Sequence, residues 1–222
     1  MHYIWQNADL KQGAILAFAP NADLGRDPRW GRTEECFGED PWLVGTLSAA
    51  MVRGLQGDDP NYWQCASLMK HFFANSNEDT RSSSSSDFDS RQFHEYYGVG
   101  FRMGIEAGSR AFMTAYNAHN GIPCTIHPIV TEVAEKRWGM DGIVCTDGGA
   151  FRLLMSDHKH TTDPAIAARD CLKAGITRFL DQYIPAVNNA LERGLVSEAD
   201  LDAAVRKNLR VQLKLGALDG LL

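Results

Sequence analysis

Short apolar segments alternate with longer amphipathic segments along most of this chain. We expect about five strands, at Ile15–Ala19, Ser67–His71, Ala111–Ala115, Ile143–Thr146 and Thr177–Leu180. Regular alternation of strands with helices predicts a parallel sheet, because the chain must cross a face of the sheet before it starts the next parallel strand. Short strands that are almost entirely apolar are typical of a sheet buried on both faces, as in a barrel core.

The segments between and after these strands carry helical patterns. We expect helices at Trp42–Leu55, Ser90–Glu106, Pro128–Arg137, Pro164–Ala174, Ile184–Arg193 and Glu198–Leu215. The last one has the clearest signals, because Ser197 is a good N-cap and Gly216 follows the final turn. Apolar residues repeat every four positions on one face of this helix, at Leu201, Val205, Leu209 and Leu213.

Composition excludes several classes of function. The chain has 222 residues, of which 44% are hydrophobic and 23% are charged, with a net charge of −6. An acidic chain argues against nucleic-acid binding, and no apolar run is long enough to span a membrane. The five cysteines are scattered without a Cys-x-x-Cys pair, which favours free thiols over a disulfide framework or a zinc site. The sequence therefore implies neither a metal nor an organic cofactor.

Polar clusters follow four of the expected strands. They lie at Gly25–Arg32, Lys70–Arg81, Tyr116–Gly121 and Asp147–Gly149. Because the carboxyl ends of parallel strands meet at one edge of a sheet, we expect these clusters to share one rim. Cations, amides, a tyrosine and a carboxylate together can bind a ligand with many hydroxyl groups.

Seven short motifs give the chain a resemblance to a known family. They occur in order at Arg26–Arg32, Phe37–Pro41, Gly54–Gly57, Lys70–Phe72, Ala115–Asn117, Trp138–Gly142 and Val144–Asp147. With them the chain resembles the barrel domain of family 3 glycoside hydrolases, which include β-glucosidases and β-xylosidases. The resemblance implies an α/β, TIM-barrel-like fold. Because relatives carry further βα units before the arginine loop, residues 1–222 are expected to form a single, incomplete barrel domain of about five βα units.

The resemblance implies a catalytic role for Asp147, which aligns with the nucleophile of the family. A retaining glycosidase needs an ionised carboxylate below the anomeric carbon of the sugar, and the end of a strand holds such a group rigidly. For an aspartate after a strand, the common structural alternative is the N-cap of the next helix.

The resemblance also implies a set of sugar-binding residues: Arg32, Lys70, His71, Arg81 and Tyr116. In the family, the lysine and histidine grip sugar hydroxyl groups, and the tyrosine lies next to the nucleophile. Structural alternatives remain for each type of residue. The histidine could be an ordinary buried residue, the lysine and Arg81 could be solvated charges, and the tyrosine hydroxyl could point to water.

The sequence also departs from the family pattern in several places. Gly148 and Gly149 follow Asp147 where many relatives have a tryptophan, and Ser82–Ser86 is a serine run that predicts a flexible loop tip. No residue matches the general acid/base of the family. Glu78, Asp87 and Asp89 could take that role, although hydrogen-bonded or solvated loop acids are the more common outcome.

Two classes of function stay open on the sequence. One is a retaining β-glycosidase, or a fragment of one, that hydrolyses terminal β-glucosides or β-xylosides through Asp147. The other is a carbohydrate-binding barrel that lacks the general acid/base, or that a missing domain or a second copy of the chain completes. The partner expected in both cases is a small carbohydrate, and the sequence does not assign a cellular compartment.

Overall fold

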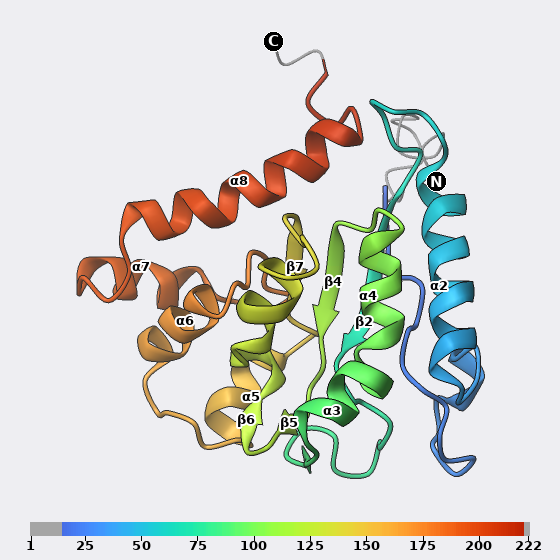
Figure 1. Ribbon diagram of the computed structural model, residues 1–222. Coiled ribbons are helices and arrows are strands. Elements are labelled where there is room, and N and C mark those ends of the chain that lie inside the picture. The colour runs from blue at the N-terminus through green and yellow to red at the C-terminus, as the bar shows by residue number, and fades with distance from the viewer. Residues whose placement is uncertain (1–14, 220–222) are drawn as a thin grey trace, which may run out of the picture.

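The computed structural model of the chain describes residues 15–219. Within that range, the central sheet has four parallel strands, which lie side by side in the order of the sequence. They are β1 (Leu16–Ala17), β2 (Ala66–Phe72), β4 (Ala111–Thr114) and β7 (Ile143–Cys145). In Figure 1 the strands run from the α8 end of the molecule toward the opposite end. The expected α/β fold with a parallel sheet is confirmed, and the barrel is incomplete.

The fifth expected strand is not formed. Thr177–Leu180 contributes a single parallel bridge, in which Arg178 pairs with Cys145. The hydroxyl group of Thr177 explains the interruption, because it accepts the backbone N–H of Val144 at 3.0 Å. A side chain therefore makes the hydrogen bond that a backbone carbonyl would make in a regular ladder.

Two helices cover one face of the sheet. They are α2 (Pro41–Gln56) and α4 (Val99–Glu106), which pack against each other beside β2. The ring centroid of Phe72 lies 5.0 Å from that of Phe101 and 4.7 Å from that of Phe112, so aromatic contacts join α4 to β2 and β4.

The C-terminal helix α8 (Glu198–Lys214) crosses the sheet near the N-terminal ends of the strands (Figure 1). Its expected N-cap is confirmed, because Ser197 and Asp200 form a capping box. The expected apolar stripe is largely solvent-exposed: Val205, Leu209 and Leu213 are 53%, 40% and 52% exposed. The helix packs on the sheet through Val211, with Leu215 just beyond its end, and both are buried against apolar residues of β2, β4 and β7.

The remaining helices lie on the β7 side and around the rim. They are α5 (Ala150–Ser156), which the sequence did not predict, α6 (Pro164–Lys173) and α7 (Ile184–Glu192). The segment expected as one helix at Ser90–Glu106 is divided into α3 (Ser90–Gln92), a π-helical turn (Phe93–Tyr97) and α4. The helix expected at Pro128–Arg137 is a π-helical segment at Val130–Glu135. None of the helices in the described part of the chain has the length and apolar character needed to cross a membrane.

A small second sheet corrects the prediction for the serine run. It consists of β3 (Ser85–Ser86), β5 (Ala118–His119) and β6 (Ile122–Pro123). Two of the serines expected at a flexible loop tip therefore belong to a strand, and the hydroxyl group of Ser86 also donates to the carbonyl of Ala74 at 3.1 Å.

A glycine sets the position of β7, and this can be tested. A Cβ atom on Gly142 would overlap the backbone carbonyl of Arg110, which accepts the N–H of Ile143 at the start of the β4–β7 ladder. We expect Gly142→Ala to lower the free energy of unfolding by about 1 to 3 kcal/mol. Gly54→Ala in α2 is the control, since nothing lies within 4 Å of its new Cβ. That substitution should raise stability by about 0.5 to 1 kcal/mol. Chemical denaturation of both variants measures the difference, and equal effects would contradict the role of Gly142.

Candidate active site

Asp147 lies two residues beyond β7, at the carboxyl end of the sheet. Its side chain is 15% exposed, and its Oδ1 accepts the N–H of Gly148 at 2.7 Å. The N-cap position of α5 belongs to Gly149, with no side-chain cap, so the carboxylate of Asp147 does not cap that helix. One carboxylate oxygen, Oδ2, lies 3.7 Å from Nε2 of His71.

Lys70 and His71 come from β2, the strand two places from β7 in the sheet. Adjacent residues of a regular strand point to opposite faces. Here the pairing between β2 and β4 is irregular between Met69 and Phe72, and such an irregularity can redirect a side chain. Both side chains consequently reach the same polar cluster.

Glu35 holds two of the expected sugar-binding cations together. It accepts from Arg32 through both carboxylate oxygens, at 2.6 and 2.9 Å, and its Oε2 lies 3.1 Å from Nζ of Lys70. Hydrogen bonds from Arg32, and then from Lys70, lower the pKa of Glu35 to about 2. Sequence reasoning missed this residue, although an acid three positions after an arginine on a short helical turn is a usable signal.

His71 is buried against a second acid that the sequence did not indicate. Its Nδ1 lies 2.8 Å from Oδ2 of Asp23, and the two side chains are 3% and 1% exposed. The same ring reaches Arg32, whose Nη2 lies 3.3 Å from Nε2. Burial raises the pKa of Asp23, and the hydrogen bond with His71 opposes that rise.

Arg81 and Tyr116 also come together at this rim. The guanidinium carbon of Arg81 lies 4.8 Å from the ring centroid of Tyr116, and the tyrosine hydroxyl donates to the carbonyl of Gly148 at 2.6 Å. Burial, and then the charge of Asp147, raise the pKa of Tyr116 to about 12. Arg81 also pairs with Glu78 at 2.8 Å, and its side chain is 35% exposed.

Each of the carboxylates considered as a general acid has a structural partner. Glu78 accepts from the indole nitrogen of Trp30 at 3.0 Å, Asp87 accepts from Ser85, and Asp89 caps α3. A fourth acid, Asp181, accepts the N–H of Phe151 in the first turn of α5 at 2.8 Å. Burial raises the pKa of Asp181, and the charge of Asp147 adds to this effect.

The structure therefore gathers the sequence-predicted residues into one cluster at the carboxyl ends of the strands. Asp147, His71, Arg32 and Lys70 are linked through direct contacts and Glu35, while Tyr116 and Arg81 approach from the neighbouring loops. Among residues 15–219, no group of three or more histidine, cysteine or acidic side chains could hold a metal ion.

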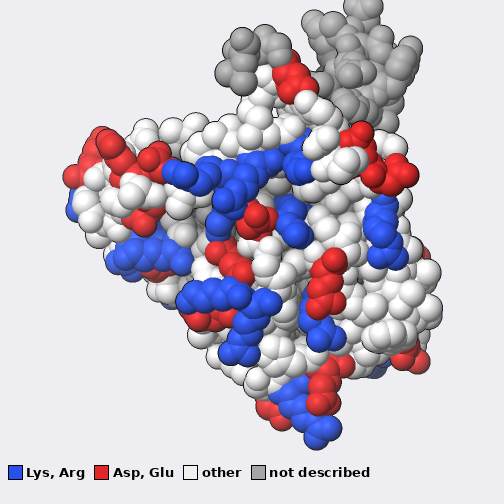
Figure 2. Space-filling model, turned by 45° about the horizontal axis from the view of Figure 1, so that its top comes forward, with Lys and Arg blue, Asp and Glu red and all other residues white. Residues whose placement is uncertain are grey.

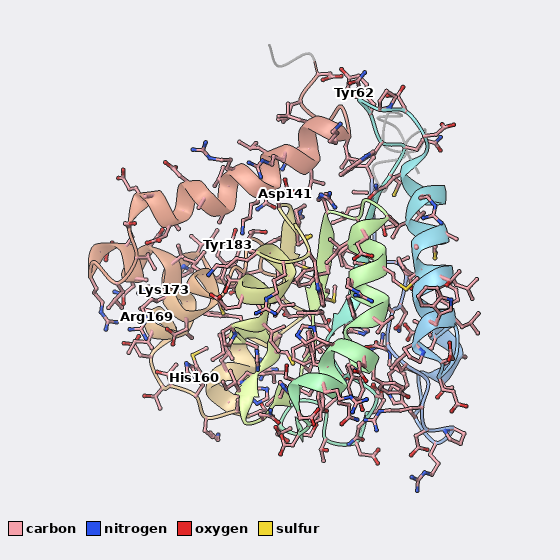
Figure 3. The ribbon with its side chains drawn as sticks, viewed as in Figure 1. Tyr62, Asp141, His160, Arg169, Lys173 and Tyr183 are labelled. Carbon is pink, nitrogen blue, oxygen red and sulfur yellow. The ribbon has the colours of Figure 1, made fainter. Side chains whose placement is uncertain are left out.

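A hollow lies at the other end of the sheet. It has a volume of about 920 Å³ and is lined by residues that include Tyr62, Trp63 and Lys214. Asp141 pairs there with Arg110 at 3.0 Å and with Arg210 at 3.1 Å. Figure 2, turned so that this end comes forward, shows Lys and Arg side chains gathered around acidic ones, and Figure 3 shows Asp141 below α8 and Tyr62 near its C-terminal end. These charges pair with each other, far from the rim that carries Asp147.

The fold and this rim are those of an α/β barrel domain of the kind found in glycoside hydrolases. The chain belongs to glycosyl hydrolase family 3, because the model of the N-terminal domain of that family matches residues 5–211.

The named relatives with similar sequences are glycosidases, which agrees with this assignment. The chain is 34% identical over 212 residues to the periplasmic beta-glucosidase of Salmonella typhimurium. This alignment covers 92% of the chain and 27% of that protein. The chain is also 34% identical to probable beta-D-xylosidase 7 of Arabidopsis thaliana, with 91% of this chain and 28% of that protein covered.

Solved structures show the same likeness. A GH3 exo-beta-xylosidase, XlnD, in complex with a xylobiose aziridine probe superposes with a TM-score of 0.88 at 27% identity, over 94% of this chain and 28% of that one. The beta-glucosidase of Listeria innocua in complex with glucose superposes with a TM-score of 0.84 at 33% identity, over 92% of this chain and 29% of that one. The chain thus spans less than a third of the length of these relatives.

Two buried histidines support the loop that carries Tyr116. His119 and His127 have ring centroids 5.1 Å apart, and the N–H of Ile129 donates to Nδ1 of His127 at 3.1 Å. Burial, and then the nearby His119, lower the pKa of His127 to about 4. His127 is therefore neutral in the folded protein at pH values where it is protonated in the unfolded chain.

This depressed pKa predicts an acid-sensitive fold. The stability that His127 contributes is present above its ordinary pKa and is lost as the pH falls toward 4, by about 3 kcal/mol in total. His127→Asn removes the titration, and its amide oxygen can still accept the N–H of Ile129. We expect denaturation midpoints to fall less steeply between neutral and acidic pH in this variant than in the wild type. Parallel pH profiles would rule out the assignment.

Proposed function

We propose that this chain is the barrel part of a retaining β-glycosidase that acts on terminal β-glucosides or β-xylosides, with Asp147 as the nucleophile. The observation that carries the proposal is the position of Asp147. Its carboxylate is partly exposed at the end of β7, beside a histidine, an arginine and a lysine that can form hydrogen bonds with sugar hydroxyl groups. The names of the β-glucosidase and β-xylosidase relatives support the substrate class.

The chemistry follows from this arrangement. The carboxylate of Asp147 attacks the anomeric carbon, the bond to the leaving group breaks, and the sugar is held as an ester on Asp147. Water then attacks the same carbon and releases the sugar with retained configuration. Arg32, Lys70 and His71 hold the hydroxyl groups, and Arg81 and Tyr116 form the wall of the pocket next to Asp147.

The leaving group needs a proton, and the acids at this rim are engaged elsewhere. Glu78 is tied to Trp30 and Arg81, and Asp181 is tied to the start of α5. We place the general acid/base in a part of the enzyme beyond this chain, since the chain covers 27% of the Salmonella relative. A catalytically impaired, carbohydrate-binding barrel is the second candidate, and the same engaged acids favour it.

Covalent labelling tests the nucleophile. A 2-deoxy-2-fluoro glucoside or xyloside with a dinitrophenolate leaving group needs little help from an acid, because its leaving group departs unprotonated. We expect the wild-type chain to gain the mass of one fluorosugar on the peptide that contains Asp147, and Asp147→Asn to gain none. Asp157→Asn, which removes an exposed acid beyond α5, is the matched control and should label like the wild type. Labelling of Asp147→Asn would refute the assignment.

A comparison of two substrates tests the missing acid. General acid catalysis contributes roughly 10²- to 10⁴-fold in rate, and mainly for poor leaving groups. We expect the chain to cleave a dinitrophenyl glycoside but to leave cellobiose and xylobiose intact. Turnover of either disaccharide would show that an acid lies within the chain, and loss of that turnover in Asp181→Asn would identify it.

A further inference from the structure

The geometry points to Asp23 as a positioning residue that fixes the tautomer of His71. It holds the imidazole ring neutral, with its hydrogen on Nδ1 and a free electron pair on Nε2. The consequence for catalysis rests on the proposed function, but the tautomer itself does not. The pair is buried, with side chains that are 1% and 3% exposed, so water does not compete for the contact between them.

The contacts at Nδ1 identify the donor and the acceptor. Oδ2 of Asp23 lies 2.8 Å from Nδ1 of His71 and also accepts the backbone N–H of His71, at 3.3 Å. A backbone N–H can only donate, and an ionised carboxylate can only accept, so Oδ2 of ionised Asp23 acts as the acceptor in both contacts. The hydrogen of the first contact therefore belongs to Nδ1. Nδ2 of Asn75, which can only donate, also faces this nitrogen, but at 3.5 Å it lies beyond the usual hydrogen-bond range, so the shorter contact with Asp23 decides.

The contacts at Nε2 select the same tautomer independently. Nη2 of Arg32 lies 3.3 Å from Nε2, and a guanidinium group has donors but no acceptor. A hydrogen on Nε2 would face the hydrogens of Arg32, so Nε2 must accept. Glu35 holds Arg32 in this place with two hydrogen bonds, and the arginine cannot simply turn away.

This tautomer has a chemical consequence at Asp147. Nε2 lies 3.7 Å from Oδ2 of Asp147. A protonated Nε2 would attract the carboxylate and weaken it as a nucleophile, whereas a free electron pair leaves the carboxylate reactive and can accept a hydrogen bond from a sugar hydroxyl. Asp23 fixes the tautomer of His71 without contact to the sugar, and we therefore class it as a positioning residue.

Two substitutions of Asp23 with side chains of similar shape separate the effect of its hydrogen-bond acceptor from the effect of its charge. Asp23→Asn keeps an oxygen that can accept from the backbone N–H and from Nδ1 of His71, and it should preserve the tautomer. Asp23→Leu removes the acceptor at nearly the same volume. In that variant we expect the hydrogen to move to Nε2, where it opposes Arg32, and the rate of fluorosugar labelling to fall by up to roughly 100-fold, as for a misplaced binding group.

Nitrogen-15 NMR of the histidine rings at neutral pH is the measurement. The His71 signals are assigned as those missing from His71→Gln among the seven histidines of the chain. We expect a protonated, pyrrole-like Nδ1 and an unprotonated, pyridine-like Nε2 in the wild type and in Asp23→Asn, and the reverse in Asp23→Leu.

Three results would overturn the inference. The first is a wild-type ring with a hydrogen on Nε2 or on both nitrogens. The second is an unchanged tautomer in Asp23→Leu, and the third is an Asp23→Leu variant that labels as fast as Asp23→Asn. If Asp23→Leu does not fold, the spectra of the wild type and Asp23→Asn still decide the tautomer. If the wild type shows the expected tautomer but never labels, the proposed function fails and the role of Asp23 in fixing the ring stands.

Discussion

The parallel pairing of β2, β4 and β7 is the constraint on which the rest of this structure depends. Because these strands run in one direction in adjacent places, the residues that follow them must emerge at the same edge of the sheet. Residues that are far apart in the sequence, such as His71 and Asp147, become neighbours for this reason. The register is set at the other end, where Gly142 lets β7 approach the carbonyl of Arg110.

The rim then has to accommodate several cations in a small volume. Arg32 and Lys70 would repel each other, and the ring of His71 would lose hydration, if these groups were buried without acids. Glu35 and Asp23 solve this problem in different ways. Glu35 is partly exposed and pairs with two cations, whereas Asp23 is buried and pairs with one ring. The rim therefore keeps donors that face the pocket, while the compensating carboxylates lie behind them.

The sequence predicted the four central strands because burial on both faces leaves short, almost entirely apolar segments, and it predicted the main helices from their amphipathic patterns. It failed where a side chain replaced the backbone, as Thr177 does beside Val144. It also failed to identify which face of α8 is buried, because Val211 and Leu215 follow a different spacing from the exposed stripe. Periodicity shows that a helix is amphipathic, but the packing partner decides which apolar residues it covers.

The residues that orient the site were harder to predict than those that face the pocket. Arg32, Lys70 and Asp147 belong both to family motifs and to the polar clusters that follow the expected strands, so the sequence indicated them. Asp23 belongs to none, and it meets His71 across 48 positions of sequence. Such a contact follows from the pairing of β1 with β2 and from the path of the chain after β1, which no local pattern contains. The supporting acids of a strand-end pocket are therefore visible only after folding, although they determine the charge and the tautomer of the groups that meet the substrate.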